Sequence, residues 1–315
     1  MLRALQSHRA AGLAVIALII AVAPLFFPSM FYYRMGTAIF IAGIAVVGLN
    51  ILMGLAGQVS LGHAGFYGIG AYAVAVLPAQ YNVPGLAAIG IGILAAGIVA
   101  WVVGRPILRL KGHYLAVATL GFGVLVSMVL TNEGWLTGGP DGMSVKRLVL
   151  FGVVLKDRQT WYWLSAGILI LSALVAINLI DSPTGRAMRA LHDSEVGAAV
   201  NGIDIAHYKL TAFVISACYA SLAGSLAALS DAFITPASAG FLKSIELVTM
   251  VVLGGMGSVI GGILGAAFLE TLPQLLAHLQ EVEHILLGLI IMLVMIFMRD
   301  GIFPTLARRL RRGTP

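Results

Sequence analysis

Charged residues are scarce in this 315-residue sequence, at only 10% of the total, whereas hydrophobic residues reach 60% and the mean hydropathy is +1.00. A soluble globular chain carries roughly a quarter of its residues as Asp, Glu, Lys and Arg, so this composition excludes that class. We therefore interpret the chain as an integral membrane protein.

Other features are missing as well. The only cysteine, Cys218, cannot form an intramolecular disulfide and is interpreted as a small core residue without redox chemistry. No G-x-x-x-x-G-K-[ST] phosphate loop occurs, and no lysine follows a glycine, so we expect this chain itself to bind neither ATP nor another cofactor. His63 has no second ligand at usable spacing, which argues against a metal site.

Apolar runs recur along the whole chain. A hydrocarbon core about 30 Å thick needs about 20 apolar residues per helix, and fewer for a short or re-entrant one. Arg3 and Arg9 precede the first run, which we interpret as a retained span because apolar residues continue beyond the possible cleavage site at Ala21–Ala23. The candidate segments are 11–27, 37–56, 62–80, 86–104, 114–130, 161–180, 210–231, 244–257, 258–276 and 285–298.

Basic residues give the formal charge of +6 and cluster in short connections and near the C-terminus. This distribution indicates orientation in a membrane and not nucleic-acid binding. Threading the chain through all segments brings most Lys and Arg to one side, which we therefore predict to be cytoplasmic. That side carries the N-terminal segment 1–10, the loop 181–209 and the basic tail 299–315. The opposite side carries the loop 131–160, in which a small hairpin about Gly152 is expected.

The stretch 57–70, GQVSLGHAGFYGIG, is rich in glycine without a regular four-residue spacing. We interpret it as irregular backbone at membrane depth, which is tolerated only inside protein or along a watery cavity and which marks substrate paths in transporters. Gln58, Ser60 and His63 either line such a pathway or form hydrogen bonds between helices, and the sequence does not decide between these roles.

A second glycine-rich stretch lies at 254–265. Gly257, Gly261 and Gly265 have the four-residue spacing that brings helices close together in lipid. Gly254 is a further pathway candidate. Asn50, a polar residue in an apolar segment, is interpreted either as a link between helices or as a pathway residue, and Glu246 and Glu270 are expected near the outer ends of their spans.

The segment DSPTGRAMRALHDSEVGAAVNGI, from Asp181, is too polar to span a membrane. Ser182 or Thr184 can cap a first helix, and Gly202 can end a second one after a joint near Asp193 and Ser194. Two short helices of this kind are a compact docking element, although the same pattern also fits a surface helix that only connects spans.

The pattern Glu195, Ala198, Gly202 resembles the cytoplasmic E-x-x-A-x-x-x-G signature with which permease subunits of ABC importers contact their ATPase. The blocks GQVSLGHAGFYGIGAY, RLKGHYLAVATLGFG, LTGGPDGM and VVLGGMGSVIGGILGA also resemble, in order, those of the high-affinity branched-chain amino acid permeases of the LivM type. Gly65 and Asn201 depart from that family's usual residues.

This resemblance implies an all-α polytopic bundle of about 8–10 transmembrane helices, some short or interrupted by glycine, with cytoplasmic coupling helices. It also implies a subunit without its own catalysis that imports branched-chain or other hydrophobic amino acids by alternating access. The implied ATPase-coupling residues are Arg186, Arg189, His192, Asp193, Glu195, Ala198 and Gly202. Glu195 is expected to accept hydrogen bonds or a basic partner across the ATPase interface.

The same resemblance implies partners. They are a second, LivH-type permease, two ATP-binding cassette subunits that bind ATP and Mg, and an extracytoplasmic substrate-binding protein. The expected location is the bacterial cytoplasmic (inner) membrane, with both termini in the cytoplasm and no nucleic-acid partner.

Alternatives remain at this stage. Related permeases carry other amino acids, amides, urea or small carboxylates. An ion-coupled secondary transporter would also contain glycine-broken helices, but it should show ionisable residues deep in its spans. A channel would need a selectivity filter, and nothing in the sequence resembles one. A membrane enzyme built on the HDSE run at 192–195 would need a second cluster to complete its site, and none is present.

Overall fold

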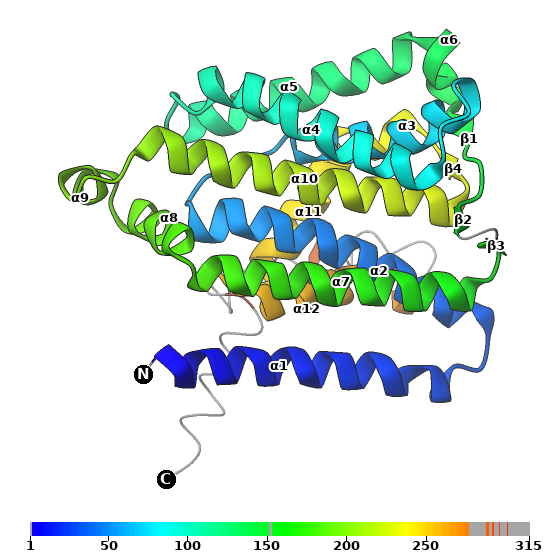
Figure 1. Ribbon diagram of the computed structural model, residues 1–315, viewed down its shortest axis with the longest axis horizontal. Helices are drawn as coiled ribbons and strands as arrows, with labels where there is room; N and C mark the ends of the chain where they lie inside the picture. Colours follow the sequence, from blue (N-terminus) through cyan, green and yellow to red (C-terminus); the bar gives the residue numbers. More distant parts are fainter. Residues whose placement is uncertain are drawn as a thin grey trace.

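The computed structural model describes residues 2–150 and 153–276, together with the isolated positions 288, 289, 292, 296 and 301. The expected span 285–298 and the basic tail 299–315 therefore lie almost entirely outside the described residues. Within the described part, long helices run side by side as a bundle whose two ends carry different elements (Figure 1).

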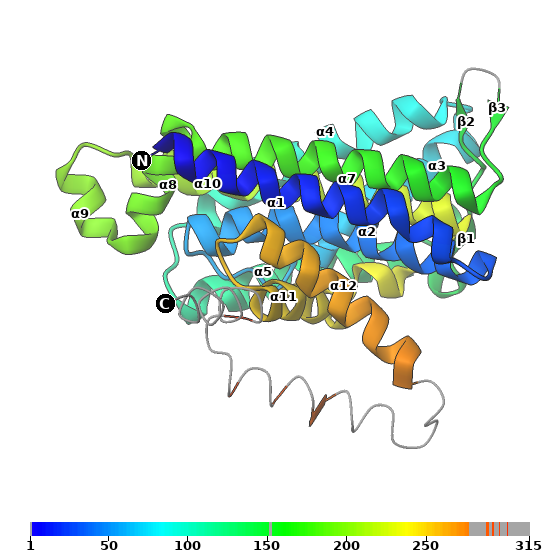
Figure 2. The same cartoon turned by 90° about the horizontal axis from the view of Figure 1, so that it is seen from below.

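The bundle is built from helices of unequal length. The long elements are α1 (Leu2–Val22), α2 (Met30–Asn50), α3 (His63–Gln80), α4 (Gly85–Ile107), α5 (His113–Asn132), α7 (Arg158–Asp181), α10 (Ile205–Asp231), α11 (Phe241–Gly254) and α12 (Val259–Leu276). A π-helical turn, Ile51–Leu55, extends α2, and a 3-10 turn, Ala23–Phe26, follows α1. Figure 2 shows α11 and α12 together along one side of the bundle.

Six described helices are long and apolar enough to cross a membrane, namely α2 with its π-helical turn, α4, α5, α7, α10 and α12. This confirms the predicted all-α, polytopic membrane fold. By contrast, α11 has only 14 residues, fewer than the about 20 that a crossing helix needs.

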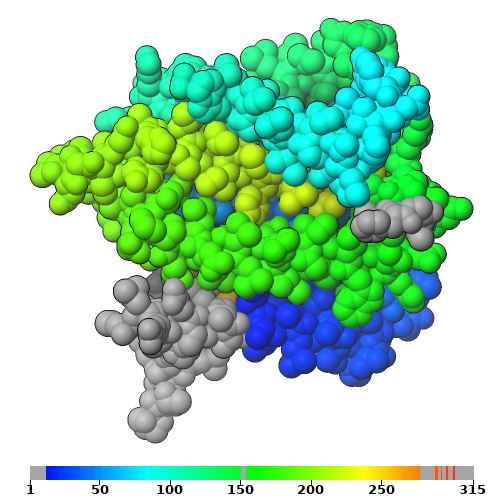
Figure 3. All heavy atoms as spheres, viewed as in Figure 1, coloured from blue at the N-terminus to red at the C-terminus, as the bar shows by residue number. Residues whose placement is uncertain are grey.

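The centre of the bundle is α2. In α2, 83% of the most apolar stretch is buried inside the protein, against 22% in α4 and 28% in α5. In the space-filling view α4, α10 and α7 cover most of one face, with α2 behind them (Figure 3). The exposed Leu94 and Trp101 on α4 are the kind of side chains that lipid accommodates, so α4 and α5 form the periphery.

One end of the bundle carries the short elements α8 (Pro183–Asp193) and α9 (Glu195–Val200), which project beyond the long helices (Figure 1). We call it the α8/α9 end. The first residues of α1 lie at the same end, so the predicted N-terminal segment 1–10 and the predicted loop 181–209 share one side.

The opposite end, which we call the hairpin end, carries the loop 131–160. It contains α6 (Gly134–Thr137), a 3-10 turn (Gly139–Asp141) and the strand β1 (Met143–Ser144), which pairs with β4 (Phe233–Ile234). The strands β2 (Val149–Leu150) and β3 (Val153–Val154) pair antiparallel. The hairpin predicted about Gly152 is thus confirmed by its flanking strands.

The helices α3 and α11 are each preceded by backbone that is not α-helical. Residues 56–62 connect the π-helical turn to α3, and β4 with the 3-10 turn Pro236–Ala239 leads into α11. The predicted irregular backbone is confirmed for 56–62, whereas Gly65, Gly68 and Gly70 are helical.

Steric constraints and hydrogen bonds stabilise the non-helical segment 56–62. A β-carbon on Gly62 would overlap the backbone carbonyl of Thr119, so only glycine fits there. The Leu61 amide donates to Thr119 Oγ1 at 3.1 Å, and the Ala64 amide donates to Ser244 Oγ at 3.0 Å. These side-chain partners replace the helical hydrogen bonds that buried backbone otherwise needs.

Candidate functional site

The α8/α9 element consists of two capped helices. The hydroxyl of Ser182 accepts a hydrogen bond from the Gly185 amide at 3.2 Å and caps α8, and the hydroxyl of Ser194 accepts one from the Gly197 amide at 3.1 Å and caps α9. The two helices, the Ser182 cap and the joint near Ser194 were predicted from the sequence and are confirmed. The element is folded, not a flexible linker.

Two of the predicted coupling residues, Arg186 and Arg189, form hydrogen bonds within this chain. Arg186 Nη1 donates to the Asp181 carbonyl at 3.0 Å, and the guanidinium of Arg189 donates to the Ile180 carbonyl. Both carbonyls belong to the last turn of α7, where helical partners are missing and basic side chains are favourable. Arg186 and Arg189 thus fix the angle at which α8 leaves α7.

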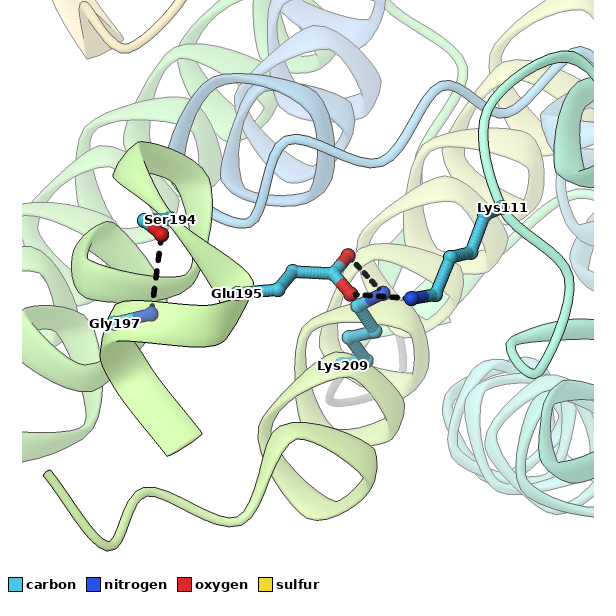
Figure 4. Close-up of polar contacts among 5 residues, drawn as sticks. All are labelled: Lys111, Ser194, Glu195, Gly197 and Lys209. Carbon is cyan, nitrogen blue, oxygen red and sulfur yellow. Dashed lines mark hydrogen bonds and ion pairs between the residues drawn. The ribbon is translucent and has the colours of Figure 1, made fainter. Parts of the chain in front are cut away.

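Glu195 holds α9 against two other segments. Its carboxylate accepts a short hydrogen bond from Lys209 Nζ at the start of α10, and its second oxygen lies 3.8 Å from Lys111 Nζ in the connection between α4 and α5 (Figure 4). The Lys209 side chain is only 7% exposed, so its charge requires a counter-ion within the protein. Within this chain Glu195 thus already has a basic partner, and its expected contact across an ATPase interface stays a prediction.

The outward surface of α9 is apolar. Val196 and Val200, one helical turn apart, are 76% and 83% exposed, whereas Ala198 is buried. Gly202 stands in a left-handed turn with φ +76°, directly after α9. Of the predicted motif, Ala198 thus packs inward and Gly202 turns the chain, while the exposed face consists of residues between them that the sequence analysis did not select.

His192 connects the α8/α9 element to the non-helical segment 56–62. A β-carbon on Gly57 would stand 3.1 Å from His192 Cδ2, so the end of α8 lies directly against the beginning of segment 56–62. His192 also pairs with the exposed Asp193 at 3.7 Å. The predicted coupling residues and the predicted irregular segment are therefore in contact.

The pathway candidates differ in how their polar groups are used. The fully buried His63 ring lies 2.7 Å from Ser216 Oγ through Nε2 and 3.3 Å from Ser60 Oγ through Nδ1. In contrast, both polar atoms of the buried Gln58 amide make no hydrogen bond within the described residues. A buried amide without partners is costly, so Gln58 is the candidate with hydrogen-bonding capacity left for a passing molecule.

Asn50 ties α2 to the turn between α11 and α12. Its Nδ2 donates to the Ser258 carbonyl at 2.8 Å, and its Oδ1 accepts from the Gly257 amide at 2.7 Å. Gly257 lies in this turn with φ +80°, whereas α12 begins at Val259. The expected stripe of packing glycines is therefore wrong at Gly257, because that residue reverses the chain and is not helical.

Close packing between α11 and α12 comes from other positions. A β-carbon on Gly265 would overlap the Met250 carbonyl, and one on Gly261 would overlap the Gly254 carbonyl. Gly254, predicted as a pathway residue, thus takes part in this contact.

The similarity to known proteins supports a transport function. The family model described as "Branched-chain amino acid transport system / permease component" matches residues 32–298. The chain belongs to this permease family. No solved structure gives a significant match.

Curated relatives agree with this membership. The high-affinity branched-chain amino acid transport system permease protein LivM of Escherichia coli K12 is 36% identical over 314 residues, which cover 92% of this chain and 74% of that protein. LivH of the same kind of system in Salmonella typhimurium is 24% identical, covering 81% of this chain and 89% of that protein. The autoinducer 2 import system permease protein LsrC of Escherichia coli O9:H4 (strain HS) is 29% identical, covering 68% of this chain and 61% of that protein.

In a permease of this family, the exposed valines of α9 stand out. Both valines lie on a helix that projects from the bundle, which makes them candidates for a docking surface. The sequence signal was available, since Val196 and Val200 have helical spacing in an otherwise polar loop. The family motif instead points to Glu195, Ala198 and Gly202, whose side chains or turn geometry stabilise the fold.

Proposed function

We propose that this chain is the permease subunit of an ATP-driven importer that translocates branched-chain or other hydrophobic amino acids. The observation that carries the proposal is the apolar surface of α9, held on a helix that Glu195 fixes to α10 and to the α4–α5 connection. Because α9 is fixed in this way, a displacement of α9 can be transmitted to the bundle and is not absorbed by local deformation.

The proposed assembly contains a second, LivH-type permease and two ATP-binding cassette subunits, which bind ATP and Mg. An extracytoplasmic binding protein delivers the solute. The names of the relatives support the permease pair, and the lack of a phosphate loop in this sequence is consistent with ATP binding by other subunits. We place the protein in the bacterial inner membrane with the α8/α9 end in the cytoplasm, because most Lys and Arg residues are predicted on that side.

In the proposed mechanism, closure of the ATPase dimer displaces α9 through Val196 and Val200. The Glu195 ion pairs carry this movement to α10, and the contact of His192 with Gly57 carries it to segment 56–62. Because packed helices move as rigid bodies, the bundle changes between outward-open and inward-open arrangements. Gln58 lies within the moving segment and offers its free amide to the solute.

The test is reconstitution of the complete assembly in proteoliposomes, with uptake of radiolabelled L-leucine measured with and without ATP. Val196→Glu and Val200→Glu should each reduce ATPase association about tenfold or more, as expected for central apolar contacts. Val149→Glu is the matched control, since Val149 is 52% exposed at the opposite end. Uptake by this chain without ATPase subunits, driven by an ion gradient, would instead establish a secondary transporter.

A further inference from the structure

A cavity of about 490 Å³ opens near the hairpin end of the bundle, far from the α8/α9 element. Residues of α2, α3, α10, α11 and α12 line it. Its volume falls within the about 300–1,000 Å³ typical of sites for small molecules. No local sequence pattern marks it, because its walls come from segments far apart in the chain.

The cavity contains two charges of each sign. Arg34 and Asp231 form an ion pair at 3.8 Å, in which both side chains are more than half exposed. Lys243 pairs with Glu246 at 2.8 Å and lies 6.0 Å from the centre of the Tyr67 ring.

Glu270 differs from the other three charged residues that line the cavity. It lies on the apolar helix α12 and lines the cavity. Among the described residues, Lys243 attracts its carboxylate electrostatically, but no cation lies within ion-pair distance and the carboxylate makes no hydrogen bond. Ionisable side chains inside membrane helices are expensive and normally have a partner, so a carboxylate facing a cavity in this way points to a ligand that supplies one.

The remaining wall is mixed: Met35, Ile41 and Leu247 are among its apolar side chains, and Thr37, Tyr67, Ser230 and Gln274 are its polar ones. A ligand that suits the whole cavity therefore has one cationic group, one anionic group and an aliphatic part. A free amide or urea has no charge to match those of the cavity, and a simple carboxylate brings no cation to Glu270, which Lys243 attracts only from beyond ion-pair distance. An α-amino acid with an apolar side chain fulfils all three requirements.

A second cavity, of about 370 Å³, adjoins the first and shares Arg34 and Asp231 with it. Its other charged residues are Arg147, Lys156 and Arg158, all basic and all in or beside the loop 131–160. The Arg34–Asp231 pair thus stands between a basic outer cavity and the charge-balanced inner one.

We propose that the inner cavity is a binding site for a zwitterionic α-amino acid, whose ammonium group pairs with Glu270 and whose carboxylate pairs with Arg34. Its aliphatic side chain lies against Met35 and Ile41. This inference rests on the proposed function and specifies the solute class and its site in this subunit. During binding, Arg34 exchanges its partner Asp231 for the carboxylate of the solute.

The direct test is protection of a cysteine from a small thiol reagent. Cys218→Ser removes the only native thiol, and Met35→Cys or, in a second variant, Ala227→Cys places one on the cavity wall. In the purified complete importer without its binding protein, L-leucine should slow modification of both cysteines about threefold or more. 3-Methylbutylamine and 4-methylpentanoate, which each lack one charge, should not. Val149→Cys, outside both cavities, should react at the same rate with and without leucine.

The matched functional test compares Glu270→Gln with Glu133→Gln. Both change one carboxylate to an amide, but Glu133 lies at the surface of the hairpin end and bonds Trp135 Nε1 at 2.7 Å. Glu270→Gln should lower ATP-driven leucine uptake about tenfold with assembly intact, Glu270→Asp should recover part of it, and Glu133→Gln should transport normally.

Different results would contradict the cavity assignment and the proposed importer function. If the unmodified importer takes up leucine with ATP but leucine protects neither cysteine and Glu270→Gln transports normally, the cavity assignment is overturned and the importer stands. Protection by phosphatidylethanolamine but not by leucine would likewise overturn it, because a lipid headgroup would then be the occupant. If the unmodified assembly shows no ATP-driven uptake of any amino acid, the proposed function itself fails.

Discussion

His192 lies directly against Gly57, so the last turn of α8 touches the first residue after Ala56 where the α2 span gives way to segment 56–62. The contact joins the element that we propose to receive force with the segment that we propose to line the path. No other residue type suits this position well, because Gly57 has φ +66° and a side chain would press on the imidazole.

Gly57→Ala should therefore uncouple ATP hydrolysis from uptake and lower stability by about 1–2 kcal/mol, the typical cost of a left-handed alanine. Gly112→Ala is the control, because Gly112 also has a positive φ of 57° but has open space around its β-carbon position. The measurement is the ratio of ATP hydrolysed to leucine imported. An equal loss of coupling in both variants would show that backbone strain, not the His192 contact, is responsible.

The ion cluster at Glu195 predicts an unequal role for its two lysines. Lys209→Met should lower the melting temperature of the subunit clearly, because it leaves Glu195 with only a distant, exposed partner. Lys111→Met should change it little, since the Lys111 side chain is 81% exposed and surface ion pairs contribute about 0–1 kcal/mol.

Glu195→Gln extends this comparison. It should destabilise the natural chain by less than the about 3–5 kcal/mol of a fully buried pair, because the Glu195 side chain is 35% exposed. In the Lys209→Met background the same change should have a smaller effect, since the buried charge is already gone. Additive losses in melting temperature would contradict a direct interaction.

Asn50→Leu removes both hydrogen bonds to the turn between α11 and α12. It leaves the Gly257 amide and the Ser258 carbonyl without partners, at about 1–3 kcal/mol for each group. We expect a lower unfolding temperature and faster proteolysis near residues 255–258. Asn132→Leu, at an exposed position at the end of α5, should have neither effect. Normal stability of Asn50→Leu would argue against the proposed tie.

Gly265→Leu should prevent α11 and α12 from packing, because even a methyl group would overlap the Met250 carbonyl. The expected outcome is loss of folded protein, measured as the monodisperse fraction after detergent extraction. Gly167→Leu provides the comparison, since a β-carbon on Gly167 meets nothing within 4 Å. Equal yields of the two variants would remove the close-packing argument.

Local patterns predicted the local structure well. The Ser182 cap, the joint near Ser194, the hairpin flanking Gly152 and the irregular backbone after Gly57 all depend on residues within a few positions of one another. Turn and capping preferences act over that distance, so a single sequence contains the necessary information.

Pairings between distant segments were not predictable in the same way. The pairing of Glu195 within the chain was not predicted, because nothing near it in the sequence indicates that Lys209 is buried and needs a counter-ion. The cavity at Glu270 depends on Arg34 and Asp231, which lie on other helices. Gly257 has the spacing of a packing residue but a backbone conformation that spacing does not reveal.

The two valines on α9 also bear on how this subunit is made. If α9 is the proposed docking surface, a newly inserted copy presents Val196 and Val200 to water until its partner binds. Such a surface invites self-association and recognition by quality-control proteases. Synthesis of the chain in excess of its partners should therefore yield a short-lived pool, and its abundance should follow the supply of whichever subunit covers α9.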